Sequence, residues 1–334
     1  MNAWGSLFAS LLAVIILAVI SWLGVRAVGL ESLFGVVIPY VAITVFIVGV
    51  VYRIVQWARI PVPFRIPTTC GQAKSLPWIK ANNLEAPYNI WGVIGRMALE
   101  VLLFRTLFRN TKVELWEGPK ATYASAKWLW LGGILFHYSF LIILLRHLRF
   151  FLQPVPGFVD LITNVDGFFN ILVPTIFLTD IAFLTAVTYI FLRRVAIPQL
   201  RYISLASDYF PLFLILGIGI TGFLMRTTWK VDLLGVKELA LGLVTFHPAV
   251  PAGIHPIFYM HLFLVSVLLA YFPFSKLMHA GGVFLSPTRN LANNNRMKRH
   301  INPWNYPVKV HTYEEYEDEF RAKMKEVGIP VDKE

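Results

Sequence analysis

The sequence opens on an uncharged apolar run that is long enough to cross a lipid bilayer. Residues 6–25 contain no charged side chain, and the first charged residue of the chain is Arg26. A transmembrane helix needs about 20 consecutive apolar residues. No basic stretch precedes the run and no small-residue cleavage signal follows it, so we expect it to be retained as a membrane span rather than removed as a signal peptide.

Five further runs of this kind follow along the chain. The last of them is interrupted by prolines, so we expect its helix to begin near His255 or Pro256 and to continue to about His279. The sequence therefore predicts an all-α integral membrane protein built as a six-span transmembrane helix bundle. The five runs cover residues 32–52, 128–145, 167–192 (with the single charge Asp180), 209–225 and 239–275.

Composition agrees with a membrane protein and excludes other classes. Charged residues make up 15% of the 334 residues, whereas a soluble domain carries about 25%. Aromatic residues make up another 15%, which excludes an intrinsically disordered chain. The single cysteine, Cys70, cannot by itself hold an iron–sulfur cluster, a four-cysteine zinc ion or a covalently attached haem. Any redox cofactor must therefore be bound by other ligands.

Basic residues are distributed unequally between the loops, and this asymmetry predicts the orientation. Cytoplasmic loops of membrane proteins carry an excess of Lys and Arg. With six spans both termini lie on one side, and the loops and tail on that side contain 24 Lys and Arg against 6 on the other. We therefore expect a multi-pass protein of the cytoplasmic membrane with both termini in the cytoplasm. The basic excess describes orientation and does not indicate nucleic acid binding.

The predicted spans divide the chain into four parts. Residues 1–60 are expected to hold two transmembrane helices, and residues 61–124 to form a cytoplasmic loop. In that loop, charged side chains interrupt the apolar positions of residues 90–109, which predicts an amphipathic helix lying in the membrane interface. Residues 125–280 hold the remaining four spans. Residues 281–334 are expected to form a cytoplasmic tail, whose acidic stretch is either solvated or a docking surface for a partner.

Four of the eight histidines lie in predicted spans or at their ends. His137 and His147 belong to the third span, and His261 and His279 to the sixth. A histidine in hydrocarbon is costly unless it is paired or coordinated, and imidazole is a common haem ligand. Two histidines on each of two helices therefore predict two haems, each bound by two histidines. The alternative is a non-redox membrane anchor or transporter whose histidines are hydrogen-bonded core residues.

The direction of the spans predicts how the histidines pair. The third and sixth spans run antiparallel, so His137 should face His279, and His147 should face His261. The spacings do not match, because ten residues correspond to about 15 Å of helix and eighteen residues to about 27 Å. Helix tilt and a kink at Pro273 would have to absorb this difference.

The segments around these histidines resemble a known family. FHYSFLIILLRHLRF (residues 136–150) and YMHLFLVSVLLAYFPFSKLMHA (residues 259–280) are similar to the two haem-bearing helices of the nitrate reductase gamma-subunit family of cytochromes b. That family has histidine pairs at the same spacings and an ending like Pro273–His279. The extra N-terminal span and the tail resemble one branch in particular, the membrane cytochrome b subunit of the sulfite-reduction-associated DsrMKJOP complex. This branch is similar to the cytochrome b of membrane heterodisulfide reductase.

The resemblance implies a four-helix di-haem cytochrome b domain over residues 125–280. His137 and His279 would bind the inner haem b, nearer the cytoplasm, and His147 and His261 the outer haem b. It also implies that menaquinol is oxidised near the outer face and that electrons pass to a cytoplasmic iron–sulfur subunit. In that branch the electrons serve disulfide or trisulfide reduction in dissimilatory sulfur metabolism. Further membrane and outer-side redox subunits would complete the complex.

A quinol site needs a base for the hydroxyl proton and a route to water. His255 and Asp166 are the candidates for this role on the outer side, and His247 lies on the same side. Arg146 and Arg149 are candidates for contacts with haem propionates or with quinol. Helix capping and binding of lipid phosphates are the alternative roles of these residues. Because no dinucleotide or phosphate-binding motif occurs, the catalytic subunit is expected to be another chain.

Asp180 is the single charge inside the fourth predicted span. An exposed carboxylate in mid-membrane would be expensive. We therefore expect Asp180 to be protonated or to be hydrogen-bonded to Thr179, to Thr185 or to another helix.

Overall fold

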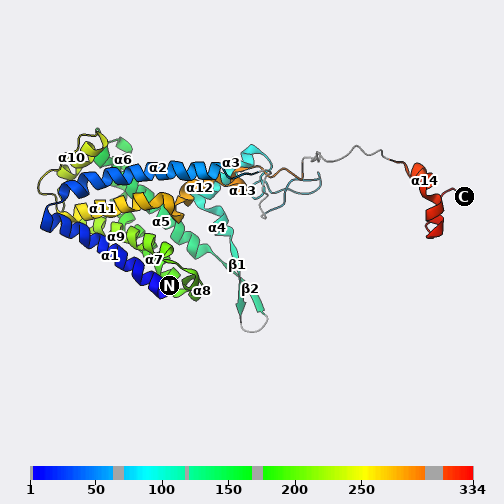
Figure 1. Ribbon diagram of the computed structural model, residues 1–334, viewed down its shortest axis with the longest axis horizontal. Helices are drawn as coiled ribbons and strands as arrows, with labels where there is room; N and C mark the ends of the chain where they lie inside the picture. Colours follow the sequence, from blue (N-terminus) through cyan, green and yellow to red (C-terminus); the bar gives the residue numbers. More distant parts are fainter. Residues whose placement is uncertain (1–2, 63–70, 117–119, 168–175, 298–310, 334) are drawn as a thin grey trace.

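The structure, a computed structural model, describes residues 3–62, 71–116, 120–167, 176–297 and 311–333. In these residues the chain is mostly helical, and six long helices lie side by side in one bundle (Figure 1). A π-helical turn, Leu33–Val37, leads directly into the second helix. The bundle helices are α1 (Ala3–Val28), α2 (Ile38–Ala58), α5 (Lys127–Phe151), α7 (Leu178–Ala196), α9 (Ala206–Thr227) and α11 (Pro256–Tyr271).

Five helical segments of the described residues are long and apolar enough to cross a membrane. They are Ala3–Val28, Leu33–Ala58, Lys127–Phe151, Ala206–Thr227 and Pro256–Phe274. This confirms the prediction of a mostly helical membrane protein. The remaining predicted span falls on α7, a helix of 19 residues that ends with Arg193 and Arg194 and packs against both α5 and α9. Residues 168–175 of that predicted span lie outside the described residues.

Small residues allow the bundle helices to approach one another. Ser6, Ser10 and Ser21 of α1 are buried, and the Ser10 hydroxyl lies 3.2 Å from the carbonyl oxygen of Ala206 at the start of α9. Phe8 on the opposite side of α1 is 61% exposed. Membrane bundles place small and weakly polar side chains between helices and large apolar ones toward lipid. The exposed apolar surface is therefore what a membrane-spanning bundle requires.

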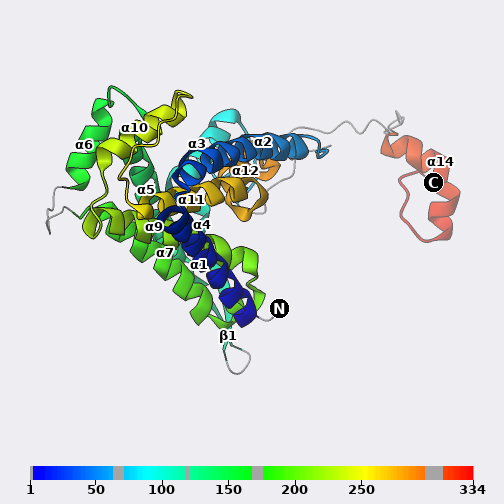
Figure 2. The same ribbon diagram turned by 60° about the vertical axis from the view of Figure 1, so that its left-hand side comes forward.

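Short helices lie at the two ends of the bundle (Figures 1 and 2). At one end are α6 (Gly157–Asp166) and α10 (Leu233–Val244). Neither helix was expected from the sequence. At the other end are α3 (Ile90–Leu103), α4 (Arg105–Arg109), α8 (Pro198–Ile203), α12 (His279–Leu285) and α13 (Pro287–Asn290).

The predicted amphipathic helix over residues 90–109 is two helices. Phe104 adopts a left-handed conformation (φ 48°), so α3 ends there and α4 begins after it. The charges of α3 face inward, because Arg96 and Glu100 are buried against α13 while Trp91 is 76% exposed. The helix thus presents an apolar face outward. Its location in the membrane interface stays a prediction.

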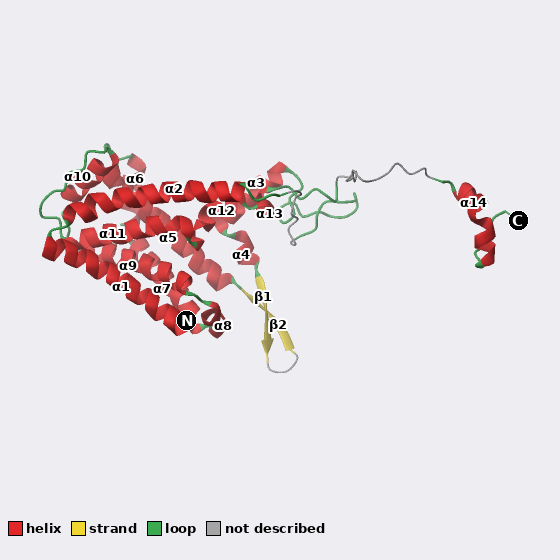
Figure 3. Cartoon of the chain, in the orientation of Figure 1, coloured by secondary structure: helices red, strands yellow, loops and turns green. Residues whose placement is uncertain are grey.

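The segment between the second and third predicted spans also contains the only β-sheet of the described residues (Figure 3). Strand β1 (Thr111–Trp116) pairs antiparallel with β2 (Lys120–Ser125), so that Thr111 lies opposite Ser125. This hairpin was not expected from the sequence.

The acidic tail contains a self-contained helix, α14 (Tyr313–Glu326). A capping box between Thr312 and Glu315 begins it. The buried Glu317 carboxylate accepts hydrogen bonds from the backbone N–H groups of Asp332 and Lys333 at 2.7 and 2.8 Å. Among the described residues, α14 shares no packing interface with the bundle. Whether this tail is solvated or docks a partner stays a prediction.

The prediction of one continuous helix from residue 256 to His279 is wrong. Helix α11 ends at Tyr271, and two 3₁₀ turns follow, Phe272–Phe274 and Lys276–Met278. Pro273 lacks the backbone N–H that a continuing helix needs, and the extended Ser275 accepts a hydrogen bond from Leu277 N through its hydroxyl. The break means that the eighteen residues between His261 and His279 do not correspond to five turns of one helix.

The packing of α5 on α7 generates a test with two neighbouring glycines. A Cβ atom at Gly132 would lie 2.7 Å from the Tyr189 ring, whereas one at Gly133 would meet nothing closer than 3.8 Å. We expect Gly132→Ala to lower the free energy of unfolding by about 1–3 kcal/mol, the usual cost of overpacking. Gly133→Ala should be neutral or stabilising, because alanine favours helix. Thermal unfolding in detergent measures both, and equal stability of the two variants would contradict this packing.

Candidate functional site

Two pairs of histidines face each other across the bundle. His137 on α5 and His279 at the start of α12 have ring centroids 6.1 Å apart, with the ring planes at 85°. His147 on α5 and His261 on α11 have ring centroids 6.5 Å apart, with the planes at 10°. The two members on α5 are separated by about 15 Å along the helix axis. The structure therefore brings the four histidines together in the pairs that antiparallel spans predict.

The separation of the rings leaves room for one metal ion in each pair. A bond from a metal ion to an imidazole nitrogen is about 2 Å long, as zinc sites show. Two such bonds in line, with about 1 Å from each nitrogen to its ring centre, place the centroids about 6 Å apart. Among the described residues, no three His, Cys, Asp or Glu side chains gather at one point. A metal ion held by one of these imidazole pairs would therefore need further ligands from outside this set of described side chains.

The backbones around the pairs are spaced in a way that fits a flat macrocycle. Helix α5 packs against α7 and α10, whereas α11 packs against α1, α2 and α9. Helices α5 and α11 are not among the closely packed helix pairs, and the His147 and His261 rings lie between them. A haem b would be held by the protein through ligands such as histidine. The residues present thus fit haem b.

Each of the four rings is oriented by a hydrogen bond at Nδ1, which leaves Nε2 as the nitrogen for a metal ion. Metal-binding histidines almost always donate their other N–H to a carbonyl, carboxylate or similar acceptor, which fixes the tautomer. A carbonyl oxygen can only accept, so Nδ1 carries the proton wherever the partner is a carbonyl. The partner atoms are the oxygens of Gly133 for His137 (2.7 Å), Ile143 for His147 (2.7 Å) and Lys276 for His279 (2.9 Å), and Oγ1 of Thr221 for His261 (2.9 Å).

Arg146, next to His147, is the centre of a buried ionic network. Its side chain is 5% exposed. One nitrogen, Nη2, donates to Asp180 Oδ1 at 2.6 Å and to Thr179 Oγ1 at 3.2 Å, and Nη1 lies 3.2 Å from Asp166 Oδ2. Nε and Nη1 make no hydrogen bond within the described residues. Arg146 therefore combines two carboxylate partners with two buried nitrogens, Nε and Nη1, that make no hydrogen bond to a described residue.

The network extends over four helices. Arg226 near the end of α9 donates to Asp180 Oδ2 at 3.3 Å. Asp166, the last residue of α6, accepts from the backbone N–H of Thr179 at 2.9 Å. The guanidinium carbons of Arg146 and Arg226 lie 3.9 and 4.0 Å from the centroid of the Phe177 ring. Two arginines balance two aspartates, which is the condition under which charges can be buried.

The position of Asp180 differs from the expectation. It lies in the first turn of α7 rather than in the middle of a span, because the described helix begins only at Leu178. It is ion-paired with Arg146 and Arg226 and is not an isolated carboxyl group. Thr179 belongs to the same network through its contacts with Arg146 and Asp166. The charges that pair with Asp180 come from other helices, which is one of the alternatives expected from the sequence.

The candidate base Asp166 has its oxygens occupied by Thr179 and Arg146. It holds α6 to α5 and α7. Arg149 has no direct ion pair among the described residues, but the charges of Arg146 and Asp180 act on it, and its guanidinium carbon is 4.8 Å from the centroid of the Phe150 ring. His247 is exposed in the segment after α10, where Nδ1 is 2.7 Å from the carbonyl oxygen of Thr245.

His255 caps α11 and lies in an aromatic cluster at the same end of the bundle. Its Nδ1 accepts from Ile257 N at 3.3 Å, and its ring centroid is 5.7 Å from those of both Trp22 and Trp229. Because Nδ1 accepts, the proton of the neutral ring is on Nε2, which makes that nitrogen a hydrogen-bond donor. Burial and the positive charge of Arg26 lower the pKa of His255 below its usual value.

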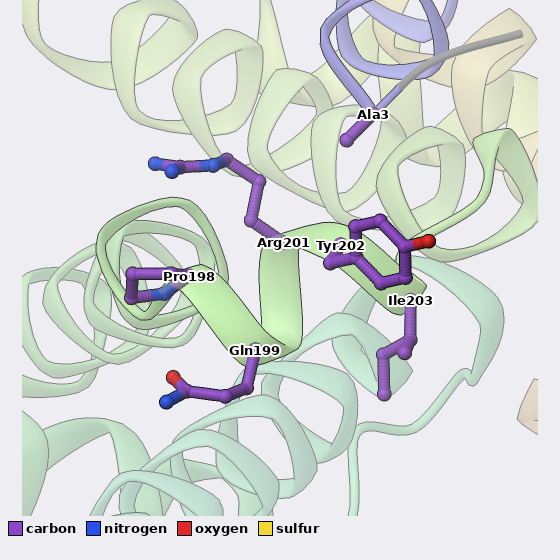
Figure 4. A pocket seen from close by; sticks show the side chains of 6 residues that line it. All are labelled: Ala3, Pro198, Gln199, Arg201, Tyr202 and Ile203. Atoms are coloured by element: carbon purple, nitrogen blue, oxygen red, sulfur yellow. The ribbon is translucent and has the colours of Figure 1, made fainter.

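Sequence reasoning missed Arg226, Trp22, Trp229 and Thr221. A signal existed for Arg226 alone, because it follows the fifth predicted span on the same side as Arg146 and so could have been matched with Asp180. Nothing in the spacing of the other three residues indicated which neighbour they contact. The pocket in Figure 4 is unrelated to these residues and to the histidines: it is lined by Ala3, Pro198, Gln199, Arg201, Tyr202 and Ile203.

Comparison with known proteins gives a consistent result. The model of the nitrate reductase gamma subunit family matches residues 88–299. The chain is 49% identical over 279 residues to the Hdr-like menaquinol oxidoreductase cytochrome b-like subunit of Archaeoglobus fulgidus, a match that covers 81% of this chain and 83% of that protein. It is 42% identical over 274 residues to the protein of the same description from Archaeoglobus profundus, covering 80% and 81% of the two chains.

The ionic network generates a stability test. Asp180→Asn removes the carboxylate that Arg146 and Arg226 share, and leaving a buried charge uncompensated costs about 3–5 kcal/mol. We expect a loss of that order in the free energy of unfolding, measured by denaturant titration in detergent. The control is Asp160→Asn, an exposed carboxylate on α6, which should change stability by less than about 0.5 kcal/mol. Equal effects of the two variants would show that the network adds nothing.

His255 generates a pH test. A histidine whose pKa is lowered by folding favours the neutral ring, so its contribution is complete above about pH 6.5 and is lost as the pH falls below that value. We expect the unfolding temperature to fall between pH 7.5 and pH 5.5, and His255→Gln to reduce this fall. Arg26→Gln should also reduce it, because the repelling charge is gone. A pH response that is the same in all three proteins would rule out His255 as its source.

Proposed function

This chain belongs to the nitrate reductase gamma subunit family, and we propose that it is a membrane di-haem cytochrome b subunit that oxidises menaquinol near the outer face of the membrane. Electrons would leave through the opposite face to a cytoplasmic iron–sulfur subunit. The reducing power would serve disulfide or trisulfide reduction in dissimilatory sulfur metabolism. The names of the two Archaeoglobus relatives support menaquinol as the substrate.

One observation carries this proposal: two pairs of histidine rings face each other at 6.1 and 6.5 Å, with all four Nδ1 atoms already engaged. His137 and His279 would hold the inner haem b, and His147 and His261 the outer one. When bound, the two haems supply one-electron carriers at two depths of the membrane. The hydrogen bonds at Nδ1 hold each ring in the tautomer that presents Nε2 to iron.

The proposed arrangement in the membrane has six crossings, with α7 as the fourth. The direction of α7 supports this, because the helix runs from the end of the bundle that holds α6 to the end that holds α8 (Figure 1). We place α6 and α10 at the outer face and α3, α12 and α13 at the cytoplasmic face, with both termini in the cytoplasm. The excess of Lys and Arg on that side supports this orientation. The apolar outward face of α3 would then rest in the membrane interface.

The outer residues suit the binding of a quinol. His255 offers an Nε2–H donor beside two tryptophan rings, which are flat apolar surfaces for a quinone ring. With the proton on Nε2, His255 can donate a hydrogen bond that orients a quinone oxygen. The ring must release the Nε2 proton or turn before it can accept a proton from quinol. Asp166 keeps α6 in place beside His147 through Arg146. The spare donors of Arg146, together with Arg149, are proposed to bind propionates or quinol.

The proposed function requires partner chains. No dinucleotide or phosphate-binding motif occurs in the sequence. The relatives are described as one subunit of an oxidoreductase. We propose that a cytoplasmic iron–sulfur subunit receives the electrons, and that further membrane and outer-side redox subunits complete the complex. The enzyme is then the complex, and this chain is its quinol-oxidising, electron-transferring subunit in the lipid bilayer.

An optical spectrum of the purified protein tests the proposal. We expect a reduced-minus-oxidised b-type band and two irons per chain. His147→Ala and His261→Ala should each remove about half of the band by emptying the outer site, and His137→Ala and His279→Ala should remove the other half. His247→Ala, an exposed histidine outside both pairs, is the control and should keep the whole band.

The same spectrum has a result that would contradict the proposal. A colourless protein that is stably folded and contains no iron would leave a membrane anchor or transporter with structural histidines. Loss of the whole band in His247→Ala as well would mean that histidine substitution disturbs the fold and does not identify ligands.

A further inference from the structure

His261 differs from the other three histidines in what orients its ring. His137 and His147 hydrogen-bond to backbone carbonyls one turn earlier on their own helix, and His279 to the carbonyl of Lys276 three residues before it. His261 on α11 instead contacts a side chain of another helix, Thr221 Oγ1 on α9, at 2.9 Å. The backbone carbonyl of Ile218 on α9 is a second hydrogen-bond partner of His261. Thr221 therefore supplies the side-chain part of this orientation, the one part among the four rings that a substitution can remove without touching the backbone.

The surroundings of the Thr221 hydroxyl fix the direction of this hydrogen bond. Oγ1 lies 2.8 Å from the carbonyl oxygen of Gly217 and 3.0 Å from that of Ile218. A carbonyl oxygen only accepts, so the single hydroxyl proton is donated to the α9 backbone, and a lone pair of Oγ1 remains for the ring. Nδ1 of His261 must then donate. This leaves the Nε2 lone pair, the nitrogen that can bind a metal ion, without a proton.

The next residue on α9 allows the ring to lie close to that helix. A Cβ atom at Gly222 would be 3.3 Å from Cε1 of His261, a distance tighter than ordinary contact. The absence of a side chain at Gly222 thus lets α9 support one side of the imidazole. The planes of the His261 and His147 rings lie at 10° to each other. Thr221 holds the imidazole in this orientation from its Nδ1 edge.

We propose that Thr221 is a positioning residue that tunes the reduction potential of the iron held by His147 and His261. This inference rests on the proposed function, because it requires haem at that pair. An acceptor at Nδ1–H makes an imidazole a stronger donor to a metal ion, which favours the more oxidised iron. The other pair draws both of its acceptors from the backbone, so a change at Thr221 acts on the outer potential alone.

A redox titration of the purified complex, followed at the b-type bands, tests the role of Thr221. Thr221→Val keeps the size of the side chain but removes the acceptor, so oxidised iron should be disfavoured and the outer midpoint potential should rise. We expect the preference for oxidised over reduced iron to fall about 3- to 10-fold, where tenfold corresponds to 59 mV for one electron. His147→Ala, which would retain the inner haem alone, identifies the inner transition.

Two further variants separate tuning from packing. Thr221→Ser keeps a hydroxyl and should restore the parent potential. Thr227→Val lies on the same helix, removes a hydroxyl that bonds only to its own helix and to Thr228, and should leave both potentials unchanged. If Thr221→Val loses the outer band, its retention in Thr221→Ser supports the inference, and its loss in both overturns it.

The inference also fails if Thr221→Val titrates like the parent, or if Thr221→Ser shifts as far as Thr221→Val. These results differ from a failure of the proposed function. In that case the parent protein itself has no b-type band and no iron, whereas here the parent titrates normally and only the role of Thr221 is lost.

Discussion

A neutral imidazole inside a membrane bundle has two ring nitrogens, and each needs a partner because lipid offers none. In this protein the Nδ1 atoms of His137, His147, His261 and His279 all have one, supplied by backbone carbonyls or by Thr221. The four rings lie in two pairs, with centroids 6.1 and 6.5 Å apart, and their Nε2 atoms remain for a metal ion. Everything proposed for the chain depends on this division of the two nitrogens between the protein and a metal ion.

The second constraint is the balance of charge at the end of the bundle that holds α6. Arg146 and Arg226 would be costly there alone, and so would Asp166 and Asp180. Their mutual pairing joins α5, α6, α7 and α9 at the level of His147. The same contacts that make these charges tolerable also fix the part of α5 that carries His147. In the proposed function, stability and electron transfer would therefore share residues at this end of the molecule.

The unequal spacings along the two histidine-bearing segments have a simple structural origin. His137 and His147 lie on one unbroken helix, whereas the path from His261 to His279 passes through two 3₁₀ turns around Pro273. An α-helix of eighteen residues would advance about 27 Å, too far to match the partner helix. Helix α11 instead ends at Tyr271 and α12 begins at His279. The His279 ring then lies opposite the His137 ring.

The sequence alone determined the membrane class, most of the spans and the pairing of four histidines, because hydropathy and chain direction are local properties that can be read along the chain. It did not indicate the contacts between helices: Thr221 with His261, Asp180 with Arg226, or the tryptophans beside His255. Those depend on how far each helix is rotated and tilted against its neighbours. Only packing in three dimensions decides these angles, and it also decided the break at Pro273 and the hairpin before α5.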